Sequence, residues 1–286
     1  MRRIIGALAA VGAITAGVVA TNSIASAGDQ YASYVALGDS FSSASGVPNQ
    51  VSLNCTRSDN NYPSLVAKEL KPSSLTDVTC GGATTVDMTG LQLPTMNPPQ
   101  FGALKPDTEL VTVGIGGNDV PFAGVVMTCG SMGAFQPVGS PCKDHYTRGG
   151  TDRLAADIHK VGPKVGAVLD GIHQRSPRAK VLLVGYPALM PESGSGCWPA
   201  IPISAGDAPY LRDATKLLNT VLAQQAAAHG ATYVDVYTSS IGHDLCALPG
   251  VKWVEGLLPT SPSAPIHPNL QGTQNQARQV LAALHR

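Results

Sequence analysis

The chain has 286 residues, equal numbers of acidic and basic side chains, and only 13% charged residues. It carries no basic run, which argues against a nucleic-acid partner, and its 43% of apolar residues can fill a core, which excludes a disordered chain. The 31 glycines and 22 prolines indicate a compact protein with long loops.

The first 27 residues have the pattern of a secretory signal peptide. Arg2 and Arg3 precede an apolar stretch that runs through Val19, and the small residues 25–27 (Ala-Ser-Ala) offer a cleavage site. A transmembrane anchor is the alternative, but the apolar stretch is short for a membrane span. We therefore expect a secreted, extracellular protein without stable membrane insertion. Its mature chain, residues 28–286, is expected to form one domain.

Along the mature chain, predicted strands alternate with predicted helices. Short apolar runs predict strands at 34–37, 75–79, 109–115, 180–185 and 232–236. Apolar residues at helical spacing predict helices at 62–70, 154–173, 209–229 and 272–284, with a short helical turn at 84–88. Loops are expected at 47–61, 93–106 and 187–207, and a disulfide-pinned insertion at 120–150. This alternation predicts an α/β fold, in which helices cover both faces of a five-stranded parallel sheet.

The first predicted strand ends in Gly38-Asp39-Ser40, and Ser40 is the candidate nucleophile. A hydroxyl at the C-terminal end of a parallel strand lies where open α/β sheets bind their ligands. Backbone N–H groups of the following turn would point at whatever is bonded to its oxygen. Gly-Asp-Ser is also an ordinary turn sequence, so the tripeptide alone does not identify Ser40 as a nucleophile.

A serine hydroxyl attacks poorly unless a base removes its proton, and histidine is the fitting base because its pKa is about 6.5. Six of the seven histidines fall on predicted helices or ordinary loops. The remaining one, His267, lies between Pro265 and Pro268 on a segment that cannot readily be helical. His267 is therefore the candidate base.

Two further strand ends supply candidate hydrogen-bond donors for an oxyanion. Gly82 follows the second predicted strand and Asn118 follows the third, and the ends of parallel strands converge at one edge of the sheet. The backbone N–H groups of Ser40 and Gly82 and the side-chain amide of Asn118 could then form an oxyanion hole. Taken singly, Gly82 is a common turn residue, and Asn118-Asp119 is a common helix cap.

These four blocks, in this order, resemble the SGNH (GDSL) hydrolase family. They are Gly-Asp-Ser40, Gly82, Gly-x-Asn118-Asp119 and His267-Pro268-Asn269. The six cysteines and the segment 80–85 (Cys-Gly-Gly-Ala-Thr-Thr) look more narrowly like the secreted bacterial lipase/esterase branch. The resemblance implies a three-layer α/β/α sandwich of flavodoxin-like type. It also implies Ser40 as nucleophile, His267 as base, Gly82 and Asn118 in the oxyanion hole, and ester hydrolysis through an acyl-enzyme without a metal or other cofactor.

One position departs from the family pattern. Many relatives carry an aspartate three residues before the histidine, where this chain has Ala264. A carboxylate there would fix the imidazole tautomer, which Ala264 can do only through its backbone carbonyl. We therefore predict a Ser–His dyad assisted by the Ala264 carbonyl. The alternative is an acid from elsewhere in the chain, for which the candidates are Glu255, Asp235 and Asp244.

All six cysteines lie in the mature chain, and an even number in a secreted protein implies three disulfides. Several pairings are possible. We predict pairing in sequence order, which joins Cys55 to Cys80, Cys129 to Cys142 and Cys197 to Cys246. The chain has no Cys-x-x-Cys or His-x-x-x-His spacing, so a zinc site is not expected.

Apolar residues crowd the segments 120–150 and 187–207, where an acyl chain could lie. They are Phe122, Val125, Val126, Met127, Met132, Phe135, Leu189, Met190, Trp198, Ile201 and Ile203. This favours lipid-like esters over sugar acetates, although the same residues could simply pack the loops. We expect a monomer that hydrolyses small-molecule or lipid esters, of lipase, esterase or phospholipase A type. The alternatives are a carbohydrate esterase or thioesterase, or a catalytically silent protein of the same fold that binds lipid or glycan.

Overall fold

A computed structural model of the chain describes residues 31–285, so the predicted signal peptide lies outside the described residues. The strands are β1 (Ser33–Gly38), β2 (Gln50–Ser52), β3 (Arg57–Ser58), β4 (Ser74–Asp77), β5 (Leu110–Gly114), β6 (Lys180–Val184) and β7 (Thr232–Val234). The α-helices are α1 (Ser40–Ser43), α2 (Tyr62–Leu70), α3 (Phe122–Phe135), α4 (Pro141–Thr147), α5 (Arg153–Arg175), α6 (Asp207–Ala228) and α7 (Leu270–Leu284). Short 3₁₀ turns are η2 (Thr85–Met88), η3 (Gln100–Ala103) and η4 (Thr238–Ser240).

Five parallel strands form one sheet in the order β4-β1-β5-β6-β7, which confirms the predicted parallel sheet. The chain first steps from β1 outward to β4 and then crosses back to β5 on the other side of β1. The direction of winding therefore reverses between β1 and β5. Open α/β sheets bind their ligands beyond the C-terminal strand ends at such a reversal, so this is where a site is expected.

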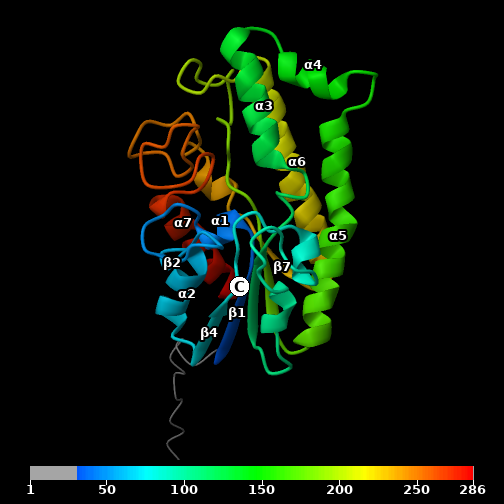
Figure 1. Ribbon diagram of the computed structural model, residues 1–286, viewed down its shortest axis with the longest axis vertical. Helices are drawn as coiled ribbons and strands as arrows, with labels where there is room; N and C mark the ends of the chain where they lie inside the picture. The colour runs from blue at the N-terminus through cyan, green and yellow to red at the C-terminus, as the bar shows by residue number, and fades with distance from the viewer. Residues whose placement is uncertain (1–30, 286) are drawn as a thin grey trace, which may run out of the picture.

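Helices cover both faces of the sheet, as Figure 1 shows, with α2 and α7 on one side and α5 and α6 on the other. Successive side chains of a strand point to opposite faces. In β1, Tyr34 and Ala36 enter the core shared with α2 and α7, whereas Val35 and Leu37 enter the core shared with α5 and α6. Both faces of β1 are thus buried, and the expected three-layer α/β/α sandwich is confirmed.

The long helix α5 illustrates why the helical predictions succeeded. Asp152 caps its first turn by accepting the backbone N–H of Ala155 at 3.0 Å. The buried side chains Ile158, Val161, Val165, Leu169 and Ile172 recur at intervals of three or four residues, which places them on one face of the helix. That face packs against the sheet and α6, and the polar positions between these residues face solvent.

Two predicted irregular segments contain regular structure. Residues 47–61, expected as a loop, include the small antiparallel hairpin β2–β3. The insertion expected at 120–150 contains the helices α3 and α4, and α3 extends away from the end of the sheet (Figure 1). Glycines interrupt the apolar period of α3, and Gly133 is needed because a Cβ there would collide with the backbone of Pro202 and Ser204. The close contact between α3 and the segment of Pro202 and Ser204 explains why residue 133 is a glycine, which the apolar pattern of the sequence did not explain.

Three disulfides join the cysteines in sequence order, as predicted. They are Cys55–Cys80, Cys129–Cys142 and Cys197–Cys246. The first links the β2–β3 hairpin to the turn after β4, the second links α3 to α4, and the third fastens the loop after β6 to the loop after β7. Within residues 31–285, no helix is both long and apolar enough to cross a membrane.

Candidate active site

Ser40 is held at the end of β1 by a tightly bonded turn. Gly38 has φ +147°, and a Cβ there would collide with the Ser42 side chain and the Gly114 carbonyl oxygen, so only glycine fits. The Gln100 side chain accepts the N–H of Gly38 at 2.8 Å and donates to its carbonyl at 2.9 Å. Asp39 caps α1 by accepting the backbone N–H of Phe41 at 2.9 Å. Ser40, the first residue of α1, is thereby fixed and is 8% exposed.

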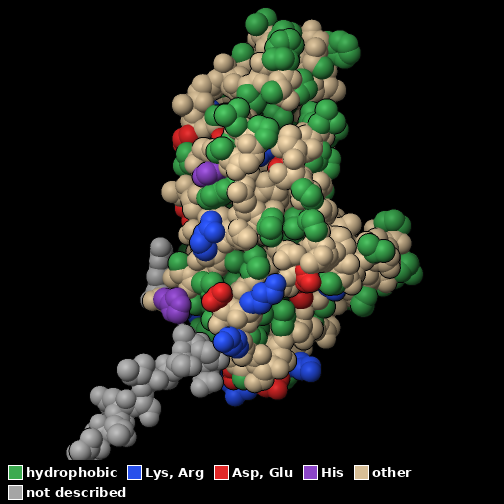
Figure 2. All heavy atoms as spheres, turned by 90° about the vertical axis from the view of Figure 1, so that its left-hand side faces the viewer, with side chains coloured by type: hydrophobic (Ala, Val, Ile, Leu, Met, Phe, Trp, Pro, Cys, Tyr) green, Lys and Arg blue, Asp and Glu red, His purple; other side chains and the backbone are tan. Residues whose placement is uncertain are grey.

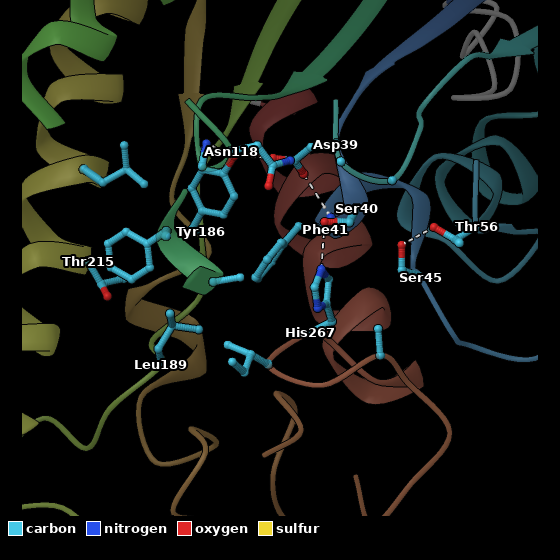
Figure 3. Close-up of a pocket in the computed structure, with 18 of the residues that line it drawn as sticks. Asp39, Ser40, Phe41, Ser45, Thr56, Asn118, Tyr186, Leu189, Thr215 and His267 are labelled. Carbon is cyan, nitrogen blue, oxygen red and sulfur yellow. Dashed lines mark hydrogen bonds between the residues drawn. The ribbon is translucent and has the colours of Figure 1, made fainter. Parts of the chain in front are cut away.

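The structure brings Ser40 and His267 together from opposite ends of the chain. The distance from His267 Nε2 to Ser40 Oγ is 2.7 Å, within hydrogen-bonding range (Figure 3). The Phe41 ring packs against the imidazole, with 4.9 Å between the ring centroids. A hydroxyl and an imidazole in this contact can exchange a proton.

The other imidazole nitrogen faces a backbone carbonyl, but not the predicted one. Nδ1 of His267 lies 2.7 Å from the carbonyl oxygen of Pro265, and the assignment of this contact to Ala264 is therefore wrong. The Ala264 carbonyl instead accepts the backbone N–H of His267 at 3.2 Å, which closes a tight turn and directs that oxygen away from the ring. Ile266 turns the chain at φ +63° and so aims the next carbonyl, that of Pro265, at Nδ1.

None of the three alternative acids contacts the His267 ring. Asp235 accepts hydrogen bonds from Thr238, and Asp244 accepts the backbone N–H of Cys246. Glu255 is fully buried, and its carboxylate accepts hydrogen bonds from Thr260 and Asn269. The backbone N–H of Glu255 donates to the His267 carbonyl at 2.9 Å and so supports the histidine loop.

The predicted oxyanion donors also lie at this edge. Gly82 has φ +77°, a conformation that favours glycine, and it lines the pocket with Ser40 and Asn118. The Asn118 amide donates one hydrogen bond to the Ala83 carbonyl at 2.9 Å, which leaves its second N–H hydrogen for another acceptor. Within the part of the chain that the structure describes, the backbone N–H groups of Ser40 and Gly82 have no hydrogen-bond partner. Together these groups can donate to one oxygen in the pocket.

Tyr186 is a site residue that the sequence reasoning missed. Its hydroxyl lies 2.5 Å from Asp39 Oδ2 and accepts the backbone N–H of Gly117 at 2.8 Å. The turn that carries Ser40 and the turn that carries Asn118 are therefore joined through one phenol (Figure 3). Asn219 of α6 holds the Tyr186 backbone through two hydrogen bonds. Tyr186 follows the end of β6, so the convergence of strand ends could have identified it.

Burial sets the protonation of two site residues. Desolvation raises the pKa of the Asp39 carboxyl from 3.8 to about 7, although the hydrogen bonds from Tyr186 and Phe41 oppose the shift. Desolvation also lowers the pKa of His267 below its ordinary value of 6.5, and the hydrogen bond to Pro265 opposes this in part. His267 is therefore predominantly neutral near neutral pH, as a general base requires.

A pocket of about 480 Å³ opens beside Ser40 and His267. Its apolar lining includes Phe122, Leu189, Leu218 and Ile266, and the polar lining includes Ser45, Asn54, Thr56 and Thr95. Among the apolar residues singled out in the two long segments, only Phe122 and Leu189 line it, whereas Val125, Val126, Met190, Ile201 and Ile203 are buried in the core. Among residues 31–285, no group of three or more His, Cys, Asp or Glu side chains is placed to hold a metal ion.

Comparisons with known proteins identify the family of this chain. The profile of the GDSL-like Lipase/Acylhydrolase family matches residues 36–274. Lipase 2 of Streptomyces coelicolor is 40% identical over 294 residues, covering 99% of this chain and 97% of that protein.

Two solved structures also resemble this one across 88% of this chain and 99% of their own. Phospholipase A1 of Streptomyces albidoflavus has a TM-score of 0.74 at 28% identity, and the extracellular lipase of Streptomyces rimosus a TM-score of 0.73 at 29% identity. The resemblance that the four sequence blocks indicated is thus confirmed. The chain belongs to the GDSL-like lipase/acylhydrolase family and is a serine ester hydrolase.

Proposed function

We propose that this protein is a secreted, monomeric hydrolase of neutral lipid esters that acts through a Ser40–His267 dyad. The observation that carries the proposal is the 2.7 Å contact between His267 Nε2 and Ser40 Oγ, in a pocket that also contains Gly82 and Asn118. Secretion is supported by the signal-peptide pattern of residues 1–27 and by the three disulfides.

In the acylation step, His267 Nε2 removes the proton of Ser40 while Oγ attacks the acyl carbon of the ester. The carbonyl oxygen becomes an oxyanion, which accepts hydrogen bonds from the backbone N–H groups of Ser40 and Gly82 and from the Asn118 amide. The tetrahedral intermediate then collapses. The C–O bond to the alcohol breaks, and the imidazolium of His267 gives its proton to the departing oxygen, which leaves the acyl group on Ser40.

Deacylation repeats the same steps with water in place of serine. His267 removes a proton from a water molecule, which attacks the acyl carbon and forms a second oxyanion in the same donor cluster. Collapse returns the proton from His267 to Ser40 Oγ and releases the carboxylic acid. The enzyme is thereby regenerated, and no step requires a group outside the residues named.

The Pro265 carbonyl takes the place that a carboxylate has in a triad. By accepting Nδ1–H it keeps the lone pair on Nε2, which is the tautomer that a general base needs. Alanine at Asp235 or Asp244, or glutamine at Glu255, should therefore lower kcat by much less than the roughly 10³-fold loss expected for a triad acid. A loss of that size in any one of these variants would place its acid in the mechanism.

The pocket suggests how the ester is oriented. An acyl chain fits against Phe122, Leu189, Leu218 and Ile266, and the alcohol would then lie on the polar side with Asn54 and Thr56. Among residues 31–285, no Lys or Arg lines the pocket, which favours a neutral ester over one with a phosphate beside the scissile bond. The relatives named as lipases support a neutral ester as substrate. The relative named as phospholipase A1 supports the alternative, a phospholipid.

Two experiments test the proposal. A fluorophosphonate should label the wild-type protein on Ser40, and the Ser40→Ala and His267→Ala variants should neither react nor hydrolyse nitrophenyl esters. Activity on esters of increasing chain length should rise beyond acetate and should extend to triglycerides. Absence of an adduct on Ser40 would instead indicate a silent binding protein, and a strict preference for acetate would remove the lipid substrate.

A further inference from the structure

Three of the segments that contribute residues to the pocket carry almost no charge. Residues 44–56, 81–104 and 115–142 contain no Lys or Arg. Their acidic residues are Asp87 and Asp119, and both carboxylates accept hydrogen bonds from neighbouring threonines. Charge is thus excluded from this end of the molecule over long stretches of chain.

The same segments expose large hydrophobic side chains. Leu53, Leu93, Met96 and Met127 are 80%, 71%, 61% and 53% exposed, and we call these four residues the apolar rim. Apart from Val51 in β2 and Leu270, the exposed large hydrophobic residues of the described chain lie in loops or helices that follow the C-terminal ends of the sheet strands. Large apolar side chains exposed together around a pocket indicate an interaction site.

The rim residues adjoin residues that line the pocket. Leu53 precedes Asn54, and Met96 follows Thr95, and both neighbours line the pocket. Met127 lies one helical turn beyond Ala123, another lining residue, so both are on the same face of α3. The rim therefore borders the opening on at least two sides.

The rim is held in place by the fold. The Cys55–Cys80 disulfide fixes the β2–β3 hairpin that carries Leu53. Gln92 and Asn97 pair as an isolated antiparallel bridge, which closes the loop that carries Leu93 and Met96. The exposed side chains are thus presented in a fixed arrangement, at no further cost in ordering the backbone.

Charge and apolar surface are separated on the molecule as a whole. Figure 2 shows most Lys, Arg, Asp and Glu side chains of that face in its lower half, while hydrophobic side chains are spread over the upper end and the projecting part. A protein with such a division can keep its charged end in water while the apolar rim enters a lipid layer.

We propose that the apolar rim docks on the surface of an aggregated neutral or zwitterionic lipid, so that the pocket mouth opens directly onto its ester substrate. This inference rests on the proposed function. A second copy of the chain seated on the rim would cover the opening and exclude substrate, whereas a lipid layer delivers it. Because the rim segments have no basic residue, attraction to anionic headgroups is not needed.

Vesicle binding tests the proposal separately from catalysis. The Ser40→Ala chain is mixed with vesicles of ether-linked phosphatidylcholine, which contains no ester bond, and the bound fraction is measured by sedimentation. We expect binding that changes little between low and high salt. The triple change Leu53→Ser, Leu93→Ser and Met96→Ser should weaken the binding by about tenfold or more, because three apolar side chains no longer leave water.

Phe135→Ser with Val138→Ser is the matched control. These residues are 92% and 71% exposed. Phe135 ends α3, about 20 Å along the helix from the pocket-lining Phe122, and Val138 follows in the next loop. The control should bind vesicles as the parent does. In the active background, the triple variant should retain the wild-type kcat/KM on a water-soluble short-chain ester and lose activity only on emulsified substrate.

Several results would overturn the proposal. They are absence of vesicle binding, equal loss in the control pair, loss of soluble-ester activity in the triple variant, or a wild-type dimer that the triple variant converts to monomer. Failure of the proposed function has a different signature, because vesicle binding would persist while hydrolysis did not depend on Ser40.

Discussion

At the scale of single residues, the role that we propose for His267 follows from the positions of its two ring nitrogens. Nε2 contacts the Ser40 hydroxyl, and Nδ1 contacts a peptide oxygen that cannot be protonated at ordinary pH. Burial lowers the pKa of the imidazole, and the Pro265 contact limits how far it falls. The residue therefore remains a usable base while staying neutral over a wide range.

The acid limb of the pH profile should follow from this shift. A base acts only when deprotonated, so kcat/KM should fall as pH drops through the pKa of His267, with a midpoint below 6.5. The measurement is kcat/KM on a soluble ester from pH 4 to 9, with full recovery on return to pH 8 as the control for denaturation. A midpoint at or above 6.5 would contradict the assignment.

Tyr186 is expected to act as a positioning residue, since it touches Asp39 and Gly117 and not the reacting atoms. Tyr186→Phe removes the hydroxyl that joins the turn of Ser40 to the turn of Asn118. The donors of the oxyanion hole should then be less well placed, and kcat should fall by about tenfold or more with KM nearly unchanged.

Tyr210→Phe is the control for this substitution, because its hydroxyl donates to Asp152 at 2.9 Å and has no contact with Asp39. It should leave kcat unchanged. If Tyr186→Phe lowered thermal stability but not kcat, its role would be structural only.

The candidate site was largely predictable because its members follow strand ends, and parallel strands bring their ends together. The orientation of the Pro265 carbonyl could not be predicted. It depends on the left-handed backbone of Ile266, and no sequence pattern predicts that conformation for a non-glycine residue. Gln100 was missed for another reason. It clamps Gly38 from a 3₁₀ turn far along the chain, and glutamine in a loop carries no recognisable spacing.

At the scale of elements, one disulfide connects the β2–β3 hairpin to the oxyanion hole. Cys80 directly precedes Gly81 and Gly82, and the Gly81 N–H donates to the Cys55 carbonyl at 2.8 Å. The Gly81 carbonyl accepts from the Gln92 side chain at 2.7 Å. The conformation of Gly82 thus depends on the covalent link beside it.

Removing this link by Cys55→Ala with Cys80→Ala should lower kcat by about tenfold or more, because one oxyanion donor loses its support. Stability should also fall, by about 2–4 kcal/mol. Cys129→Ala with Cys142→Ala removes the α3–α4 link instead and should leave kcat within about twofold of wild type. Equal kcat losses in both pairs would show that the effect is general destabilisation.

Elements with a strong apolar period were predictable, and short or glycine-rich ones were not. The five sheet strands and α2, α5, α6 and α7 agree with the predicted ranges to within a few residues. The hairpin β2–β3 is too short and polar to produce an alternating pattern. In α3, glycines placed for close packing replaced the apolar positions that would have marked a helix.

At the scale of the whole molecule, buried carboxyl groups set how stability changes with pH. The pKa of Asp39 is raised from 3.8 to about 7, and burial also raises the pKa values of Asp77 and Asp244. The folded state therefore binds these protons more tightly than the unfolded state, so stability rises as pH falls below about 7. The lowered pKa values of His267 and Glu255 act in the opposite direction, His267 below pH 6.5 and Glu255 below about 4.5.

Thermal stability should accordingly be greatest between about pH 4.5 and 7. Between pH 8 and 5.5, Asp39 alone contributes on the order of 2 kcal/mol, which corresponds to several degrees in Tm. The measurement is Tm by calorimetry at both pH values. Asp39→Asn, which cannot titrate, should reduce the difference by half or more, and a wild-type Tm that is higher at pH 8 would refute the assignment.

In the proposed dyad a peptide oxygen orients the imidazole, and this has a consequence for how the enzyme can change over generations. A carboxylate side chain can be lost through one altered codon, whereas a main-chain oxygen is present whichever amino acid is encoded. The backbone conformation at Pro265 and Ile266 is what selection has to maintain. That conformation depends on several neighbouring residues together. The orientation of the imidazole in the proposed dyad therefore does not depend on any one acidic side chain.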